Sequence, residues 1–324
     1  MNKEGLRLWP IKIGKVDKQR LESLRENALS EFGKVLKEEG IEPTSQMIAL
    51  LSDVYLPLAD WLTKHISRQP LVVGINGAQG TGKSTLSKIL QLLLDKGFEK
   101  KAVCLSLDDF YLSHHQRQIL SQTVHPLLKT RGVPGTHDVE LMLSVLSQLK
   151  QKTKQDIIVP VFDKSIDDRL PESDWLRVSL PVDMVIFEGW CVGAKPEDAS
   201  SLLQPVNQLE QDEDEDGRWR RYVNQQLAEQ YQNIFDQLDF LLMLQPPSMK
   251  KIYDWRLLQE QKLQKKTMPG EQTRIMSADE VRRFIMHYER ITRHALTEMS
   301  DRADIVLKLN NDHLVDNVIF NAAI

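Results

Sequence analysis

The sequence contains Gly77-Ala78-Gln79-Gly80-Thr81-Gly82-Lys83-Ser84, and this stretch decides the fold. It follows a short apolar run, 71–75, that predicts a buried strand, and it leads into 84–90, which predicts the start of a helix. Glycines let the backbone wrap closely around a phosphate, and the helix N-terminus adds partial positive charge there. A chance glycine-rich turn is the alternative, but strand, loop and helix together favour a phosphate-binding loop.

Two side chains of this loop have chemistry of their own. Lys83 can bridge the β- and γ-phosphates of a nucleotide, and the Ser84 hydroxyl can ligate Mg²⁺. GTPases and ATP-driven motors carry the same loop, so it does not by itself indicate a kinase; the guanine motif N-K-x-D is absent from the sequence. The predicted nucleotide-binding residues are Gly77, Gly80, Thr81, Gly82, Lys83, Ser84 and Thr85.

Short apolar runs alternate with helical patterns along the rest of the chain. We expect further strands at 102–107, 157–159, 184–187, 240–244 and 305–307, and helices at 83–95, 138–150, 218–236, 248–265 and 278–299. This alternation predicts an α/β fold, with a mostly parallel sheet covered by helices on both faces. Residues 19–67 predict two helices, and we expect 1–68 to be an N-terminal helical extension packed on a domain of 69–324. The acidic run 211–216 predicts a solvated loop.

The bulk composition is that of an ordinary enzyme. The 324 residues are 41% hydrophobic and 27% charged, with a net charge of −4, which is not the strongly basic balance expected of a nucleic-acid binder. No apolar run approaches the roughly 18 residues needed to cross a bilayer, and the first residues lack the apolar core of a signal peptide. Cys104 and Cys191 match no metal or redox spacing and predict buried free thiols. We expect a cytoplasmic protein; the sequence leaves its oligomeric state open.

Carboxylates follow two of the predicted strands. Asp108-Asp109 comes after 102–107, and Glu188 comes after 184–187. Ligands of an open parallel sheet lie beyond the carboxyl ends of its strands, so Asp108 could orient and deprotonate an acceptor hydroxyl, while Glu188 could hold Mg²⁺. The alternative is that each is a turn residue.

Together these segments resemble the P-loop D-glycerate 3-kinases, within the wider group of uridine kinase, phosphoribulokinase and pantothenate kinase. The resemblance covers about residues 70–310 and rests most specifically on Arg131-Gly132-Val133-Pro134-Gly135-Thr136-His137-Asp138 and Glu188-Gly189-Trp190-Cys191-Val192-Gly193. Leu107-Asp108-Asp109-Phe110-Tyr111, Pro160-Val161-Phe162-Asp163-Lys164-Ser165, Asp168-Arg169 and Trp255-Arg256-Leu257 agree with it.

The resemblance implies a P-loop kinase fold with a helical lid at about 246–275, and it implies roles for single residues. Asp108 resembles the catalytic base, Glu188 the acid associated with Mg²⁺, and Arg256 a lid residue that closes over the phosphates. With Lys83, Asp108 and Arg256 are the candidate catalytic residues; Ser84 and Glu188 are the candidate metal ligands. The candidate acceptor-binding residues are Asp109, Tyr111, His137, Asp138, Asp163, Lys164 and Arg169.

The chemistry of the candidate residues agrees with these roles but leaves alternatives open. A small anionic acceptor beside ATP needs cations around it, which Lys164, Arg169 and Arg256 could supply unless they are solvated surface charges. His137 could be no more than a neighbour of Asp138, which could cap the helix from Val139. Phe162 replaces a tyrosine that holds the nucleoside in uridine kinases, which disfavours a nucleoside acceptor.

The sequence therefore predicts a kinase that uses ATP and Mg²⁺ on a small hydroxy acid, most specifically D-glycerate. We expect no nucleic-acid or membrane partner. A kinase of another acceptor, such as a nucleoside or a pantothenate-like molecule, and a nucleotide-binding regulatory protein without an acceptor remain the alternatives.

Overall fold

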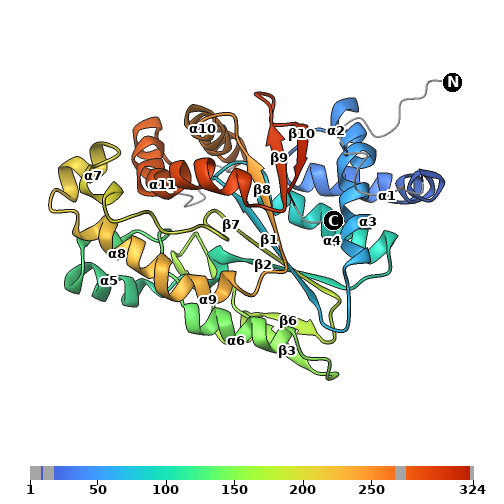
Figure 1. Cartoon of the computed structure of the whole chain (residues 1–324), viewed down its shortest axis with the longest axis horizontal. Helices are drawn as coiled ribbons and strands as arrows, with labels where there is room; N and C mark the ends of the chain where they lie inside the picture. The colour runs from blue at the N-terminus through green and yellow to red at the C-terminus, as the bar shows by residue number, and fades with distance from the viewer. Residues whose placement is uncertain (1–8, 10–17, 267–274, 322–324) are drawn as a thin grey trace.

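A computed structural model describes residues 9, 18–266 and 275–321 (Figure 1). Its centre is a six-stranded sheet in the order β10-β9-β8-β1-β7-β2, and all neighbouring strands are parallel except β10, which pairs antiparallel with β9. The strands are β1 (Leu71–Gly77), β2 (Ala102–Ser106), β7 (Met184–Gly189), β8 (Phe240–Gln245), β9 (Ile305–Leu309) and β10 (Val315–Phe320). The predicted mostly parallel sheet is confirmed.

Helices cover both faces of this sheet, as Figure 1 shows. Alternate side chains of one strand enter different cores: Val72 packs into the cluster that contains α6 and α11 residues, and Val73 into the cluster that contains α4 residues. Both strand faces are therefore apolar, as the sequence pattern requires. Beyond the N-terminal region the helices are α4 (Lys83–Gly97), α5 (His114–Thr123), α6 (Val139–Leu149), α7 (Gln208–Glu213), α8 (Arg218–Gln226), α9 (Gln232–Phe235), α10 (Met249–Lys266) and α11 (Ala278–Glu298).

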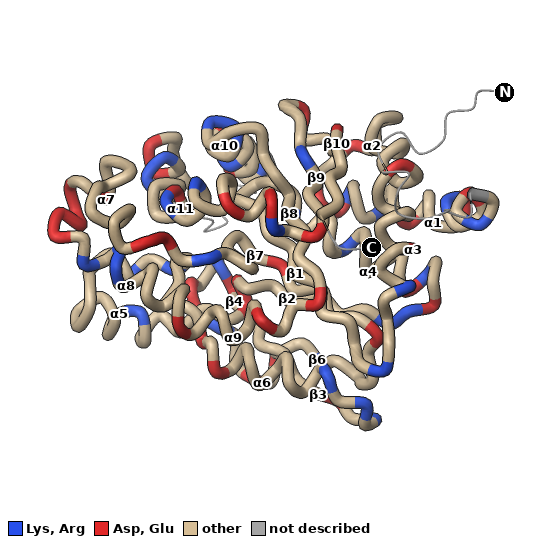
Figure 2. Tube along the Cα trace, viewed as in Figure 1, with Lys and Arg blue, Asp and Glu red and all other residues tan. Residues whose placement is uncertain are grey.

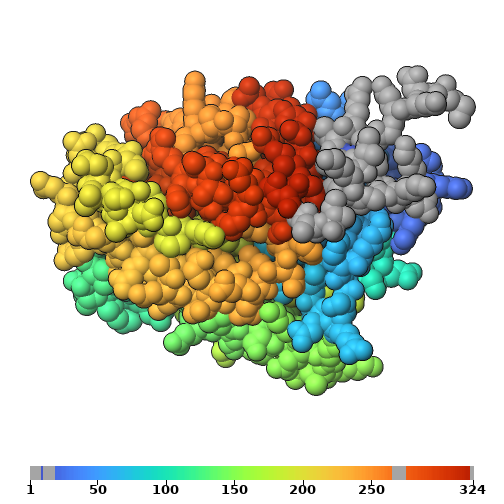
Figure 3. Space-filling model, viewed as in Figure 1, coloured from blue at the N-terminus to red at the C-terminus, as the bar shows by residue number. Residues whose placement is uncertain are grey.

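The N-terminal region is helical, as predicted. It comprises α1 (Lys18–Glu38), α2 (Ser45–Leu50), the π-helical turn η2 (Leu51–Tyr55) and α3 (Leu56–Lys64). Phe32, Leu36 and Leu58 are fully buried and belong to the same cluster as Leu93 of α4. In the space-filling view, α7 to α9 (yellow to orange) lie next to α11 (red-orange), on the side away from these blue helices (Figure 3). A domain boundary near residue 68 stays a prediction.

A strand forms where one is expected at 157–159, but the prediction that it belongs to the main sheet is wrong. It is β3 (Asp156–Val159), which pairs antiparallel with β6 (Leu176–Ser179) in a separate two-stranded sheet. Its side chains alternate between exposed and buried, so only one of its faces is covered, whereas the central strands are buried on both. A second small hairpin joins β4 (Phe162–Asp163) to β5 (Asp168–Arg169). The edge strand β10 was not predicted.

The acidic run 211–216 is a solvated loop only in part: its residues are exposed except for Asp214. Its first part belongs to α7, and Asp214 is buried, where it accepts hydrogen bonds from the backbone N–H of Trp219 (2.7 Å) and pairs with Arg220 (3.0 Å). Glu213 pairs with Arg283 of α11. These arginines neutralise charges that would otherwise repel one another. Figure 2 shows Lys and Arg interspersed with Asp and Glu along the whole trace.

The structure also bears on the predictions for the cysteines, for membrane spans and for the lid. Both cysteines are free, with Cys191 buried and Cys104 only partly so. No helix within the described ranges is long and apolar enough to span a membrane. Helix α10 fills much of the predicted lid at 246–275, but residues 267–274 of that lid lie outside the described residues. The cytoplasmic location stays a prediction.

Candidate functional site

The glycine-rich loop joins the end of β1 to the start of α4. Gly80 and Gly82 have φ angles of 80° and 90°, a left-handed conformation that favours glycine. The hydroxyl of Thr81 donates to the carbonyl of Ala78 (2.8 Å), which closes the turn, and α4 begins at Lys83. Backbone N–H groups and a helix N-terminus thus meet where a phosphate can bind.

Lys83 lies close to two carboxylates. Its ammonium donates to the carbonyl of Ala78 at 3.3 Å. Burial lowers the pKa of Lys83, while the negative charges of Glu188 and Asp108 raise it and so favour the charged form. A half-buried cation that interacts with two acids is suited to hold the terminal phosphates of a nucleotide beside them.

Glu188 and Ser84 form the part of the site that could hold a metal ion. Strand β7 is the parallel neighbour of β1, so Glu188 comes level with the loop, and its carboxylate accepts a hydrogen bond from the Ser84 hydroxyl (2.8 Å). A hydroxyl and a carboxylate are hard oxygen donors, the kind that Mg²⁺ takes together with phosphate oxygens. The two residues therefore fit this ion.

Asp108 follows β2, the strand on the other side of β7, in the short 3₁₀ helix η3 (Leu107–Phe110). One carboxylate oxygen accepts from the Tyr111 hydroxyl (2.8 Å) and the other from the Lys164 ammonium (2.5 Å). Burial would raise the pKa of Asp108, but the charge and hydrogen bond of Lys164, with help from Tyr111 and Lys83, hold it well below its usual range. The carboxylate is therefore ionised beside Lys83.

The remaining aspartates that the sequence singles out hold neighbouring backbone. Asp109 accepts from the backbone N–H of Phe162 (3.2 Å), and burial raises the pKa of its carboxyl to about 6. Asp163 accepts from the backbone and hydroxyl of Ser165 (2.8 and 2.6 Å), so it closes the β4–β5 turn and does not contact Asp108. Asp109 therefore ties the loop that carries Lys164 to the segment that contains Asp108.

A third group lies at the start of α6. Asp138 caps this helix by accepting from the N–H of Leu141 (3.1 Å), and its other oxygen pairs with Arg169 (3.1 Å). His137 is buried and stacks on Tyr111, with ring centroids 4.5 Å apart. Capping of α6 by Asp138 is therefore confirmed. His137 packs on the ring of Tyr111, whose hydroxyl contacts Asp108.

Comparison with known proteins identifies the chain. No model of a known protein family matches it. The uncharacterized kinase mug58 of Schizosaccharomyces pombe is 35% identical over 250 residues, which cover 71% of this chain and 85% of that protein. The chain belongs to the P-loop kinases related to D-glycerate 3-kinase.

Two of the relatives are named as D-glycerate 3-kinases. The chloroplastic D-glycerate 3-kinase of Arabidopsis thaliana is 29% identical over 278 residues, which cover 80% of this chain and 57% of that protein. A solved structure of D-glycerate 3-kinase from Cryptococcus neoformans matches with a TM-score of 0.64 and 27% identity, covering 95% of this P-loop kinase and 100% of the other chain.

Two predicted site residues of this P-loop kinase, Thr85 and Arg256, make their contacts away from Lys83, Asp108 and Glu188. The Thr85 hydroxyl donates to Glu39, which follows α1 (3.4 Å). Arg256 of α10 pairs with Glu260 (2.5 Å) and lies over the ring of Phe284, at 5.3 Å. The backbone of α10 nevertheless contacts the loop, because a Cβ placed on Gly80 would meet the backbone N of Arg256 at 3.4 Å. The predicted lid helix thus touches the phosphate loop, while its arginine faces α11.

A cavity of about 410 Å³ opens beside the phosphate loop of the kinase, between α10 and the β9–β10 turn. Trp255 and His313 lie in its wall, stacked with ring centroids 4.1 Å apart and ring planes nearly parallel (3°). A Cβ on Gly82 would lie 4.0 Å from the His313 ring. Trp255 is buried, and its ring also forms part of this aromatic wall.

Sequence reasoning missed three residues of the site. Arg131 pairs with Asp167 and lies over the Phe162 ring at 5.4 Å, and its charge affects the pKa of Lys164. Its place in the motif 131–138 was a usable signal. Tyr231, whose hydroxyl lies 2.6 Å from Nδ1 of His137, falls inside a helical pattern. His313 falls in a turn before a strand that was not predicted, so neither residue had a usable signal.

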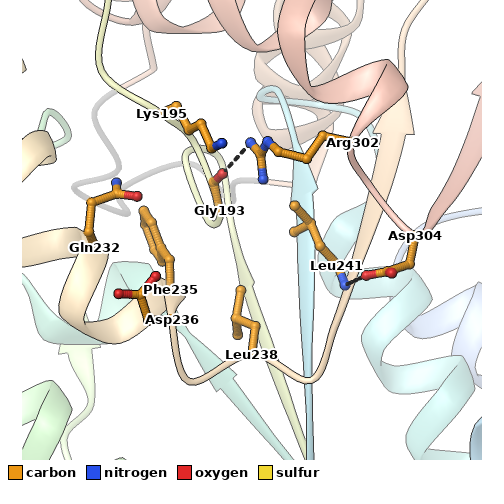
Figure 4. A pocket seen from close by; sticks show the side chains of 9 residues that line it. All are labelled: Gly193, Lys195, Gln232, Phe235, Asp236, Leu238, Leu241, Arg302 and Asp304. Atoms are coloured by element: carbon orange, nitrogen blue, oxygen red, sulfur yellow. Dashed lines mark hydrogen bonds between the residues drawn. The ribbon is translucent and has the colours of Figure 1, made fainter. Parts of the chain in front are cut away.

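A second cavity, of about 180 Å³, lies elsewhere in the kinase (Figure 4). Leu241 near the start of β8 and Asp304 before β9 line it, and Arg302 donates to the carbonyl of Gly193 at its mouth (2.7 Å). It therefore lies toward the amino-terminal ends of these strands, opposite the end where parallel sheets bind ligands.

Proposed function

We propose that this protein transfers the γ-phosphoryl group of ATP to a hydroxyl of a small hydroxy acid, with D-glycerate as acceptor and 3-phosphoglycerate as product. The observation that carries the proposal is the Asp108 carboxylate just after β2, which accepts a hydrogen bond from Lys164 (2.5 Å) and whose charge acts on Lys83. The D-glycerate 3-kinases of Arabidopsis thaliana and Cryptococcus neoformans support the choice of acceptor.

In this reaction the loop residues bind the phosphates and Lys83 neutralises charge on the transferring group. Mg²⁺ held by Ser84 and Glu188 would neutralise further charge on the nucleotide phosphates. Asp108 accepts a hydrogen bond from the acceptor hydroxyl and orients its oxygen toward the γ-phosphorus. Positioning suffices for much of the rate, because phosphoryl transfer proceeds through a loose transition state.

The acceptor side of the site is rich in cations, which suits an anionic substrate. Lys164, Arg169 and Arg131 surround the segment that contains Asp108, and each is paired with an aspartate. An acceptor carboxylate can compete for these cations, and Arg can bind it through two parallel hydrogen bonds. Lys164 is largely exposed, at 59% of its side chain, so it can exchange its partner without disturbing the core.

A coupled assay of ADP release tests the proposed function. The protein is supplied with ATP and Mg²⁺ and, one at a time, D-glycerate, L-glycerate, uridine and pantothenate. We expect D-glycerate to stimulate ADP release at least tenfold over the rate without acceptor, and the product to be 3-phosphoglycerate. Stimulation by uridine or pantothenate alone would mean that this compound, and not D-glycerate, is the acceptor. Slow ADP release that no compound changes would indicate a regulatory ATPase instead.

We further propose that the nucleotide base binds in the cavity walled by Trp255 and His313. Its volume of about 410 Å³, its aromatic wall and the closeness of the His313 ring to Gly82 of the phosphate loop suit a planar base. Stacking contributes about 1–3 kcal/mol per base. His313→Asn removes the ring but tolerates the left-handed backbone there (φ 67°).

We expect His313→Asn to raise KM for ATP about tenfold and to leave kcat at saturating ATP nearly unchanged. Steady-state kinetics with varied ATP measure this. The matched control is His65→Asn, which removes another imidazole packed against a tryptophan (Trp61, ring centroids 4.2 Å apart). His65 precedes β1, whereas the phosphate loop follows the other end of that strand. An unchanged KM for ATP in His313→Asn would mean that the nucleotide base binds elsewhere.

A further inference from the structure

His137 has one satisfied and one unsatisfied ring nitrogen. The side chain is only 4% exposed, and its Nδ1 lies 2.6 Å from the hydroxyl oxygen of Tyr231. Its Nε2 has no hydrogen-bond partner within the described part of the chain. A buried polar atom without a partner costs about 1–3 kcal/mol, so this nitrogen calls for a physical explanation.

The hydrogen bonds of Tyr231 determine where the imidazole proton lies. Tyr231 is fully buried, and its oxygen accepts from the backbone N–H of Gly135 (3.1 Å). If the hydroxyl donates to Nδ1 of His137, the only unsatisfied group is an Nε2–H. If Nδ1 carries the proton instead, both the tyrosine hydrogen and the Nε2 lone pair lack partners. Counting donors and acceptors therefore favours the first arrangement, with hydrogen on Nε2.

The ring that carries this N–H belongs to the acceptor side of the site. His137 and Tyr111 form an antiparallel bridge through their backbones, and their rings stack at 4.5 Å. Tyr111 in turn donates to Asp108 (2.8 Å), whose negative charge acts on His137. Burial lowers the pKa of His137 to about 3, so the imidazole is neutral and donates without adding charge.

We propose that Tyr231 fixes His137 as its Nε2–H tautomer, and that this N–H donates a hydrogen bond to an oxygen of the acceptor substrate. His137 is then a residue that binds the acceptor, and Tyr231 is a positioning residue that acts through it. The inference rests on the proposed function, since it assumes an acceptor beside Asp108. It explains why a buried donor is left open in the protein without substrate.

Tyr231 reaches His137 from a separate element. It ends the π-helical turn η7 (Leu227–Tyr231) between α8 and α9. π-Helical turns are rare and frequently lie at functional sites, because the extra residue redirects a side chain. The same hydroxyl also holds Gly135, whose φ of 94° lets the chain turn just before His137.

Two substitutions of His137 separate the two ring nitrogens. Glutamine places its amide nitrogen near the position of Nε2 and can keep the donor. Asparagine places its amide near Nδ1, so it can keep the contact with Tyr231 but lacks the donor. We expect His137→Asn to raise KM for D-glycerate roughly 10- to 100-fold, and His137→Gln to raise it only about threefold, with KM for ATP unchanged in both.

The role of Tyr231 has a readout that packing alone would not change. ¹⁵N NMR of the protein with ¹⁵N-labelled histidine reports on these ring nitrogens. The signals of His137 are identified because they disappear in His137→Gln. We expect a protonated, pyrrole-type Nε2 and an unprotonated, pyridine-type Nδ1. Tyr231→Phe should remove the hydrogen bond to Nδ1, change that shift, and raise KM for D-glycerate about tenfold.

The outcomes distinguish this inference from the proposed function. If D-glycerate does not stimulate the wild-type protein, the proposed function fails, while the nitrogen shifts still decide the tautomer. If the wild type uses D-glycerate but His137→Asn and His137→Gln are equal, the hydrogen bond to the acceptor is refuted. A pyrrole-type Nδ1 in the wild type would overturn the role of Tyr231.

Discussion

Replacing Asp108 by asparagine is expected to lower kcat for acceptor phosphorylation about a thousandfold, which is about 4 kcal/mol of transition-state stabilisation. The amide keeps the size of the side chain but cannot take the hydroxyl proton, and it also loses the ion pair with Lys164. KM for ATP should change by less than about threefold, because Asp108 contacts no residue of the phosphate loop through a hydrogen bond in the described part of the chain.

Asp156→Asn is the matched control for this substitution. Asp156 of β3 also accepts from a hydroxyl, that of Ser179 (2.7 Å), and pairs with a cation, Arg177 (3.4 Å), but it lies on the small β3–β6 sheet. Its kcat should equal that of the wild type. Near-normal kcat in Asp108→Asn would remove Asp108 from the role of base.

Replacing Lys83 by alanine is expected to lower kcat roughly a thousandfold and to weaken ATP binding as well. Lys83 is half-buried, and its charge interacts with those of Glu188 and Asp108. Without it, these two acids would repel the triphosphate, and charge that develops on the transferring group would lack its nearest cation.

The matched control is Lys88→Ala, one turn further along α4. Lys88 is also paired with a carboxylate, Glu39 (2.5 Å), but its side chain is 53% exposed. A salt bridge at such a surface position contributes little, so both kinetic constants should stay near those of the wild type. Substantial turnover in Lys83→Ala, measured in the same coupled assay, would contradict the role of Lys83.

Much of the nucleotide side of the site could be predicted, because its signals are local in the sequence. The loop from Gly77 to Ser84 is one continuous string, and the carboxylates at Asp108 and Glu188 each follow a strand with buried side chains. In a parallel sheet the carboxyl ends of neighbouring strands meet at one edge, so position along the chain was enough to bring them together.

The acceptor side was harder to predict because it depends on contacts between distant segments. Tyr231 reaches His137 across 94 residues, and no pattern near either residue predicts this pair. The acidic run at 211–216 suggested repulsion, but Arg220 and Arg283 reverse that expectation. The alternation in 156–159 is too short to say which sheet it joins. Arg256 pairs with Glu260, and the motif that contains Arg256 does not reveal this pairing.

A crystal structure of the full chain with a non-hydrolysable ATP analogue, Mg²⁺ and D-glycerate tests the central claim most directly. We predict that a D-glycerate hydroxyl lies about 3 Å from the Asp108 carboxylate and faces the γ-phosphorus, with Lys83 and Glu188 around the same phosphates. An acceptor bound away from Asp108, or an Asp108 side chain turned from the γ-phosphate, would contradict it.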